Sequence, residues 1–416
     1  MSFDSADRTP LLFRNARVLT LAAGGAHTPR RGAALRELGV IAQGEVLVAE
    51  GRIAAVGERV AAPEDARVID ALGRVLMPGF VDCHTHACWA GERFGEWERL
   101  MRGESYEDIL RGGGAIHATA RAVREATRNQ LSAGLRARLE EALRGGTTTI
   151  EVKSGYGLTV EAELKMLRAI QRAAGEWPGT VVPTALLGHA FEGKLDDYVR
   201  FVTRDLLPEI VREFPGVAVD AFCESGAWTL EACVRLFEKA RKRHPIRVHA
   251  DWRKSSGMIP EAVRMHALSV DHLEESTRAD LELLAGSGAF GVVLPATAFH
   301  AGGRFASAAF FVDRGGALAL ATNCNPGTAP TLSMPLVIAL AVRFCGLSPE
   351  EAIAASTVNP AVLLGFTDRG TVEAGKRADL ILLHHRDERQ LAHEFGGNPV
   401  ALVVCGGRLL PVSPAG

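Results

Sequence analysis

The sequence predicts an α/β fold: a (β/α)8 TIM barrel with a small β-sandwich domain built from both chain ends. Two observations lead to this prediction. Apolar strands alternate with amphipathic helices from residue 78 to about residue 365, and strand-rich segments occupy both flanks. Candidate polar residues follow many different strands, which favours a barrel over a doubly wound sheet. We therefore expect a barrel over 78–365 and one β-domain formed jointly by 1–77 and 366–416.

The composition narrows the class of protein. The chain has 416 residues, of which 47% are hydrophobic, enough for a large barrel and an accessory domain. The net charge is −2 and opposite charges are interspersed, so neither nucleic acid nor an anionic membrane is expected as a partner. Seven cysteines without a CxxC pair, a polar start and no run of 18 apolar residues indicate a reduced, cytoplasmic protein.

Outside the barrel, alternating apolar residues and Gly-containing turns predict strands. These strands are expected at residues 11–20, 45–57, 67–77, 370–372, 378–383 and 401–405. Residues 21–44 are rich in Gly, Ala and Arg without a clear period, which indicates an extended loop or an insertion.

Inside the barrel, eight short apolar segments predict the strands. They are expected at residues 78–82, 147–153, 180–186, 217–222, 245–249, 268–271, 289–293 and 317–321. Helices fill the gaps, for example at residues 159–174, 195–213, 229–243, 259–266, 278–286 and 349–357. In such barrels the active site lies where the strands end, so the residues after each strand are the candidates.

A His-x-His pair ends the first barrel strand. Side chains alternate along a strand, so His84 and His86 are expected to point the same way and could bind one divalent metal. The alternative is a pair that only packs or caps a loop. His249 follows the fifth strand as the third candidate ligand, and its alternative is a core histidine bonded to the backbone.

Polar residues after the first two strands could bind a substrate. Arg93 could bind a carboxylate through two hydrogen bonds, unless it is a surface residue paired with Glu92 or Glu96. Two glycines around Tyr156 would present its phenol, although a plain turn is the alternative. Lys153 could bridge metals, but a lysine facing a helix or loop is the favoured interpretation.

Two further histidines follow later strands. His189, after the third strand, could polarise or hydrogen-bond a substrate carbonyl, and its alternative is a structural histidine. His272, after the sixth strand, is expected to be an acid–base group or to support the metal site. Asp271 could fix the tautomer of His272.

The segment after the eighth strand contains amides where a hydrolytic metal site would want a carboxylate. Asn323 cannot accept a proton at neutral pH. Asn325, Gly327 and Thr328 could hold a substrate through side-chain and backbone groups. The alternative is a Pro-Gly turn without a ligand.

Taken together, several stretches resemble the imidazolonepropionase family of the amidohydrolase superfamily. They are Pro78–His86, Ala90–Arg93, Gly103–Tyr106, Gly112–Ile116, Glu151–Gly157, Asn325–Thr328 and Thr371–Leu380. The resemblance implies a (β/α)8 barrel with one zinc or iron that hydrolyses 4-imidazolone-5-propanoate to N-formimidoyl-L-glutamate in histidine degradation. By the resemblance, the metal ligands are His84, His86 and His249, the contacts to substrate or product are Arg93, Tyr156, His189, Asn325, Gly327 and Thr328, and His272 lies near the metal.

The chain departs from the family at two positions. The family has a metal-binding Asp where this chain has Asn323, and a substrate-contacting Glu that assists proton transfer where it has Trp252. An amide oxygen at Asn323 can still bind the metal weakly, and Trp252 would reshape the substrate pocket. His272 and His189 are then the expected catalytic groups, Trp252 is expected to contact a small-molecule substrate, and the protein is expected to be a homodimer. Proton transfer would fall to His272 or to a carboxylate such as Asp251, Asp271 or Glu274. The alternatives are a shifted substrate, such as another cyclic amide or an aminoheterocycle, and a catalytically impaired binding homologue.

Overall fold

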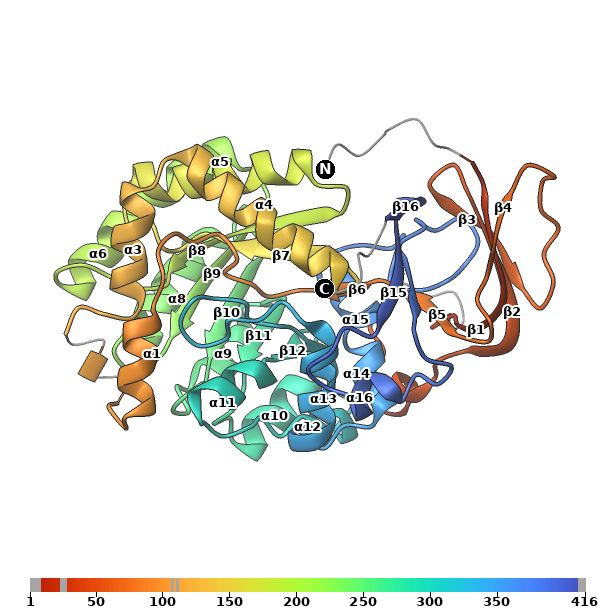
Figure 1. The fold of residues 1–416 in the computed structure, drawn as a ribbon. Coiled ribbons are helices and arrows are strands. Elements are labelled where there is room, and N and C mark those ends of the chain that lie inside the picture. Colours follow the sequence, from red (N-terminus) through yellow and green to blue (C-terminus); the bar gives the residue numbers. More distant parts are fainter. Residues whose placement is uncertain (1–8, 23–27, 106–107, 110–111, 411–416) are drawn as a thin grey trace.

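The structure is a computed structural model that describes residues 9–22, 28–105, 108–109 and 112–410. Figure 1 shows a helix-covered barrel beside a second unit made of strands from both chain ends. The prediction of a (β/α)8 barrel with a small β-domain built from both chain ends is therefore confirmed, although the described residues of that domain form one mixed sheet and not a sandwich of two sheets. Tyr106, residues 23–27 near the start of the expected 21–44 loop, and the outermost residues of both flanks lie outside the described residues.

The barrel is a parallel eight-stranded sheet in sequence order. Its strands are β6 (Phe80–Asp82), β7 (Thr147–Lys153), β8 (Thr180–Gly188), β9 (Ala218–Cys223), β10 (Ile246–Ala250), β11 (Ser269–His272), β12 (Phe290–Val293) and β13 (Ala317–Leu320). They form where the apolar segments predicted them. Most of them are buried along their whole length, because helices cover the outside and side chains fill the inside.

The first and last barrel strands meet beyond their carboxyl ends. The carboxylate of Asp82 accepts hydrogen bonds from the backbone N and Oγ1 of Thr322, at 3.2 and 2.5 Å. The backbone N of Asn323 donates to the carbonyl of His84 at 3.0 Å. These contacts place the His-x-His segment beside the segment that follows β13.

Helices surround the barrel, and side-chain caps fix several of their starts. Thr127 and Gln130 form a capping box at α4, and Ser348 and Glu351 form another at α14. The expected 195–213 helix is α6, a π-helical turn at Val202–Leu206, and α7. The helices are α1 (Phe94–Met101), α3 (Ile116–Glu125), α4 (Arg128–Arg144), α5 (Val160–Glu176), α6 (Leu195–Phe201), α7 (Leu207–Glu213), α8 (Leu230–Ala240), α9 (Met258–Arg264), α10 (Arg278–Ala285), α11 (Pro295–Ala301), α12 (Ala308–Asp313), α13 (Met334–Phe344), α14 (Pro349–Ala354), α15 (Val358–Leu363) and α16 (Gln390–His393).

The second unit is one mixed sheet in the order β16-β15-β14-β5-β1-β2-β3, with β4 paired to β1. Its strands are β1 (Leu11–Leu19), β2 (Val40–Ala49), β3 (Arg52–Gly57), β4 (Arg67–Asp70), β5 (Val75–Pro78), β14 (Leu380–Leu383), β15 (Val400–Cys405) and β16 (Arg408–Leu410). The two chain ends join where β14 runs antiparallel to β5, directly before the barrel begins.

Three further expectations about this unit were wrong. Residues 370–372 form no strand, because Gly370 has a φ of 83° and only Val372 makes a backbone bond, to Thr20. The expected 67–77 strand is two strands, since the chain turns at Gly73 with a φ of 78°. The expected 21–44 loop contains a 3-10 helix at Gly32–Arg36 and the start of β2.

Candidate active site

The structure brings the three predicted metal ligands together. His84 and His86 follow β6, and His249 lies on β10 with its ring centroid 4.4 Å from that of His84. The Nε2 atoms of His86 and His249 are 3.2 Å apart. Two nitrogens bound tetrahedrally to one zinc lie about 3.3 Å apart, since each bond is about 2.0–2.1 Å long. One ligand atom from each of the three side chains lies within 4.8 Å of the others.

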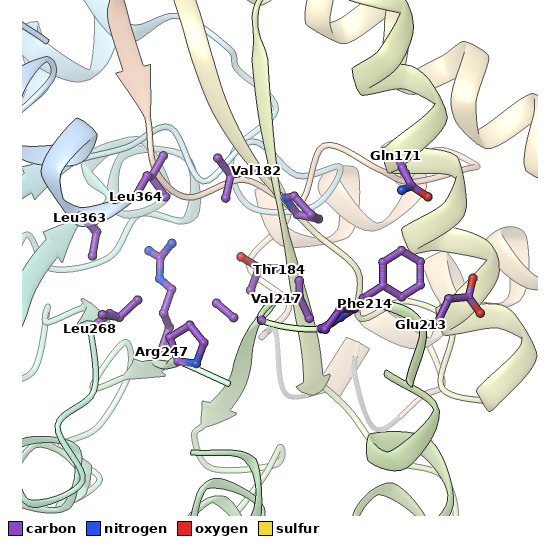
Figure 2. A pocket seen from close by; sticks show the side chains of 15 residues that line it. Gln171, Val182, Thr184, Glu213, Phe214, Val217, Arg247, Leu268, Leu363 and Leu364 are labelled. Carbon is purple, nitrogen blue, oxygen red and sulfur yellow. The ribbon is translucent and has the colours of Figure 1, made fainter. Parts of the chain in front are cut away.

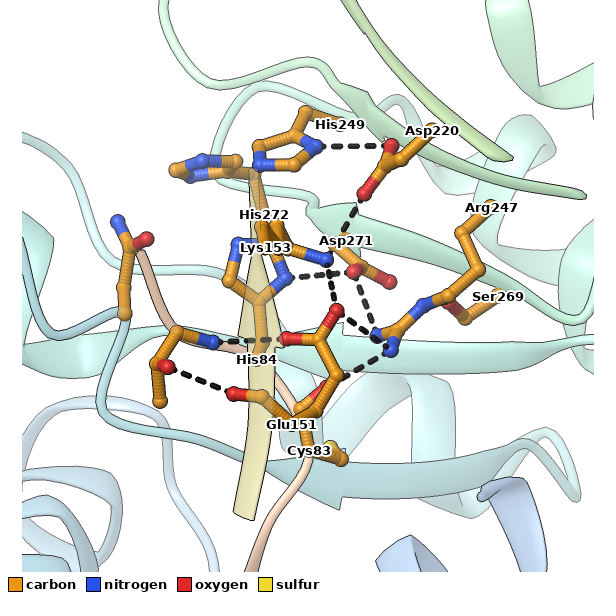
Figure 3. A network of polar contacts seen from close by, with 12 residues as sticks. Cys83, His84, Glu151, Lys153, Asp220, Arg247, His249, Ser269, Asp271 and His272 are labelled. Carbon is orange, nitrogen blue, oxygen red and sulfur yellow. Dashed lines mark hydrogen bonds and ion pairs between the residues drawn. The ribbon is translucent and has the colours of Figure 1, made fainter. Parts of the chain in front are cut away.

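Carboxylates orient two of these imidazoles. Asp271 Oδ2 lies 2.6 Å from His84 Nδ1, and Asp220 Oδ1 lies 3.1 Å from His249 Nδ1 (Figure 3). Burial lowers the pKa of all three histidines, so they are neutral, and the carboxylates accept Nδ1–H. The Nε2 lone pair of His84 is buried without a hydrogen-bond partner. Such a group is costly unless it binds something, so the three side chains fit a divalent metal.

A buried ionic network supports these carboxylates. Lys153 Nζ lies 2.8 Å from Glu151 Oε1 and 2.8 Å from Asp220 Oδ2, and Arg247 Nη2 lies 2.8 Å from Asp271 Oδ2. Burial alone would lower the pKa of Lys153, but Asp220 and Glu151 outweigh it and raise that pKa. The interpretation of Lys153 as facing a helix or loop was therefore wrong.

Most of this network was not predicted from the sequence, although the sequence contains a feature that indicates it. Asp220 and Arg247 are charged residues within strands that, apart from His249, are otherwise apolar. A charge in a fully buried barrel strand requires a partner inside the barrel. Asp271 was expected to fix the tautomer of His272, and this was wrong because Asp271 bonds His84 instead.

His272 has a different carboxylate partner. Its Nδ1 lies 3.3 Å from Glu274 Oε1, and its ring centroid is 5.6 Å from that of His249. Burial raises the pKa of Glu274, and the neighbouring His272 partly opposes this rise. His272 has a φ of 93° and Leu273 one of 74°. Side chains rarely tolerate that region, so the turn that brings Glu274 back to His272 is strained.

The two residues that depart from the family pattern, Trp252 and Asn323, both line the cavity that the predicted site residues surround. The indole of Trp252 stacks on His272 with ring centroids 5.6 Å apart and planes at 28°. Asn323 Nδ2 donates to Thr297 Oγ1 at 2.8 Å, whereas its Oδ1 is buried without a hydrogen-bond partner. That free amide oxygen could serve as a neutral metal ligand but not as a base.

His189 lies between the metal ligands and Tyr156. Its ring stacks on His86 with centroids 5.0 Å apart, Tyr156 lies 5.0 Å from His189, and His86 and Tyr156 are 6.0 Å apart, so the three rings contact one another. Burial lowers the pKa of His189 to about 3, so the ring is neutral at physiological pH. Its Nδ1–H donates to the Gly155 carbonyl at 3.0 Å, which leaves Nε2 as an acceptor. In this state His189 cannot donate to a substrate carbonyl, the role that the sequence suggested.

Arg93 is paired with Glu96, as one interpretation expected, but it is buried and is not a surface residue. Its side chain is buried and lines the site, while its Nε donates to Glu96 Oε2 at 2.7 Å. A β-carbon on Gly327 would collide with Arg93 Nη1. Glycine at this position therefore lets the guanidinium approach the backbone after β13.

The amide of Asn325 is engaged within its own turn. Its Oδ1 accepts from the backbone N of Gly327 at 2.9 Å and of Thr328 at 2.7 Å, and its Nδ2 donates to the Asn323 carbonyl at 2.7 Å. Asn325 and Thr328 line the site, as predicted, but the side-chain amide of Asn325 already has these partners. Its clearest role is to shape the turn.

The site residues surround a small cavity of about 40 Å³ at the carboxyl ends of the strands. Its lining is His86, Arg93, Ile116, Tyr156, His189, Phe222, His249, Trp252, His272, Asn323, Asn325 and Thr328. A wider cavity of about 440 Å³ lies near the strand starts (Figure 2). Its charged lining residues, Glu213 and Arg247, are already paired with Arg168 and Asp271. The smaller cavity is therefore the candidate active site, because it is the one lined by the predicted site residues.

Comparison with known proteins shows the family to which the chain belongs. The model of the amidohydrolase family matches residues 75–410. An imidazolonepropionase from Deinococcus radiodurans is 42% identical over 92% of this chain and 96% of its own length. One from Herpetosiphon aurantiacus is 40% identical over 93% and 94%. An adenosine deaminase structure from Xanthomonas campestris with bound zinc has a TM-score of 0.65 at 20% identity, covering 96% of this chain and 92% of its own. No helix among the described residues could span a membrane.

Proposed function

The chain belongs to the amidohydrolase family and, within it, to the imidazolonepropionases, and from that premise we propose how its residues divide the reaction. It is a metal-dependent hydrolase that acts on a small molecule in histidine degradation. The reaction opens the cyclic amide of 4-imidazolone-5-propanoate with water and gives N-formimidoyl-L-glutamate. One observation carries the assignment of the site: three neutral imidazoles meet, and the Nε2 of one of them, His84, is buried without a hydrogen-bond partner.

The metal ligands are His84, His86 and His249, with the amide oxygen of Asn323 as the fourth. A zinc or iron ion held there supplies a Lewis acid that makes water nucleophilic near neutral pH. Zinc is favoured by the nitrogen-rich ligand set and by the zinc bound to the adenosine deaminase of similar fold.

Proton transfer falls to His272 with Glu274. None of the described residues that line the cavity carries a carboxylate, so His272 is the remaining acid–base group beside the metal ligands. Glu274 accepts Nδ1–H of His272, which leaves Nε2 to take a proton from the attacking water. The same nitrogen then returns that proton to the ring nitrogen as the C–N bond breaks.

The opposite wall binds the substrate. Arg93 pairs with the propanoate, and Tyr156 adds a phenol hydroxyl. His189 accepts a hydrogen bond from a ring N–H, because its Nδ1–H is already engaged. Trp252 and Phe222, with ring centroids 6.1 Å apart, contact each other and offer an apolar surface to one face of the flat imidazolone.

A steady-state assay on freshly prepared 4-imidazolone-5-propanoate tests this function. We expect saturable turnover by the zinc- or iron-loaded protein, far above that of the same metal without protein. No turnover by fully loaded, folded protein would contradict it. The double variant Trp252→Glu with Asn323→Asp restores the family carboxylates, and activity that appears only in this variant would show that the natural chain is a binding homologue.

A shifted substrate is the second candidate function. The stacked Trp252 and His272 rings favour flat heterocycles, including aminoheterocycles. The same assay run on lactams and aminoheterocycles decides between them, and activity on the imidazolone alone would eliminate this candidate.

We also propose a cytoplasmic homodimer. All seven cysteines are buried free thiols, consistent with a reducing compartment. Helix α1 exposes Phe94, Trp97 and Met101, an apolar face that a second copy could cover. Light scattering and cell fractionation test these two statements.

A further inference from the structure

The carboxylate of Glu96, on α1, accepts hydrogen bonds from two segments that line the substrate side of the cavity. Its Oε2 accepts from Arg93 Nε at 2.7 Å, and its Oε1 accepts from the backbone N of Ala115 at 3.0 Å. The Arg93 side chain is 5% exposed and that of Glu96 is 14% exposed, so solvent screens the pair little.

The second contact of Glu96 is to a strained backbone. Ala115 is fully buried and has a φ of 53° and a ψ of −127°, a conformation that a residue with a β-carbon rarely adopts. The next residue, Ile116, lines the cavity. A β-carbon on Gly114 would lie 3.0 Å from Glu96 Oε1, so the segment reaches Glu96 closely because this position is glycine.

The first contact fixes how Arg93 faces the cavity. Glu96 binds Nε, and Nη1 lies against the backbone of Gly327. A substrate carboxylate that binds through Nη1 and Nη2 does not compete with Glu96 for Nε. The long arginine side chain would otherwise have many rotamers to lose when the substrate binds.

We propose that Glu96 is a positioning residue that sets the Arg93 guanidinium for substrates with a carboxylate and holds the Ala115–Ile116 wall against it. This inference rests on the proposed function. It assigns Glu96 no contact with the reacting atoms. Its loss should therefore weaken recognition of the substrate carboxylate and leave the chemical step nearly unchanged.

The test compares Glu96→Ala and Glu96→Gln with Glu98→Gln. Glu98 is the matched control, because it lies on the same helix with its side chain 58% exposed and pairs with Arg102 at 3.4 Å. Each variant is assayed on 4-imidazolone-5-propanoate and on the corresponding propanamide, which lacks the charge. Glu96→Gln separates the two contacts, since its oxygen can still accept from Ala115 while its NH2 opposes Arg93 Nε–H.

We expect both Glu96 variants to raise KM for the propanoate by about tenfold, with kcat within about threefold of the unmodified protein. KM for the propanamide should not change, and Glu98→Gln should match the unmodified protein. An unchanged propanoate KM, or equal losses on both substrates, would overturn the inference. If the unmodified protein has no turnover, the proposed function fails instead, and calorimetric binding of N-formimidoyl-L-glutamate to the same variants tests Glu96 directly.

Discussion

The two sides of the active site are built differently. On the metal side, His84 and His249 are each held by a buried carboxylate, and Lys153 and Arg247 hold those carboxylates in turn. On the proton-transfer side, His272 has one carboxylate partner at 3.3 Å.

This difference shows that the metal side is held by more polar contacts than the proton-transfer side. The ionic network contains three acids and two bases, and this excess of negative charge favours a cation beside it. The resemblance to the family implies a carboxylate on the proton-transfer side where this chain has the indole of Trp252, and a metal-binding Asp where it has the amide of Asn323. We therefore expect metal binding to tolerate little change and catalysis to depend on a single acid–base pair.

Removing a metal ligand should have the largest effect. His249→Ala deletes one of three imidazoles, so we expect both the bound metal and measurable turnover to be lost. Plasma mass spectrometry of the purified protein gives the metal content per chain. His384→Ala, at an exposed histidine, is the control. Full metal content in His249→Ala would show that the ligands are other residues.

Replacing His272 or Glu274 should lower turnover without affecting metal binding. His272→Ala should lower kcat by about 10²–10⁴-fold, because a general acid–base group is lost. Glu274→Gln should have a smaller effect, since it removes the charge that stabilises a protonated His272. Both variants should keep their metal. Loss of metal together with activity would assign His272 to the metal side.

Removing the charge of a carboxylate on the metal side should lower the affinity for the metal. Asp271→Asn leaves an oxygen for His84 Nδ1–H but removes the charge that faces Arg247. We expect zinc affinity to fall by about 10–100-fold, as is typical when a partner of a metal ligand is replaced. Competition with a chelating dye measures this affinity. Unchanged affinity would mean that the network serves folding only.

The same comparison explains what the sequence could predict. His84, His86 and His249 stand at strand ends, where the barrel pattern and the type of ligand together indicate a site. Lys153 was misjudged because its partner Asp220 lies on another strand, and only the barrel's register shows that they meet. Neighbouring residues of a strand point to opposite faces, so Asp271 was a poor partner for His272 from the start.

The smallest expected effect is on the pH dependence of the free energy of unfolding, and it comes from the buried neutral histidine His189. Burial lowers the pKa of His189 to about 3, whereas an unfolded histidine has a pKa of about 6.5. Between these values the unfolded chain binds a proton that the folded chain does not, so this histidine makes the free energy of unfolding fall as pH decreases from about 6.5 to about 3.

Replacing His189 with glutamine removes that proton uptake. We expect the Tm of His189→Gln to decline less than that of the unmodified protein between pH 7 and pH 5, at equal metal content. Differential scanning fluorimetry across this range measures it, and His384→Gln should behave like the unmodified protein. Equal slopes for all three proteins would mean that His189 already gains its proton in the folded state, which would restore it as a donor to the substrate carbonyl.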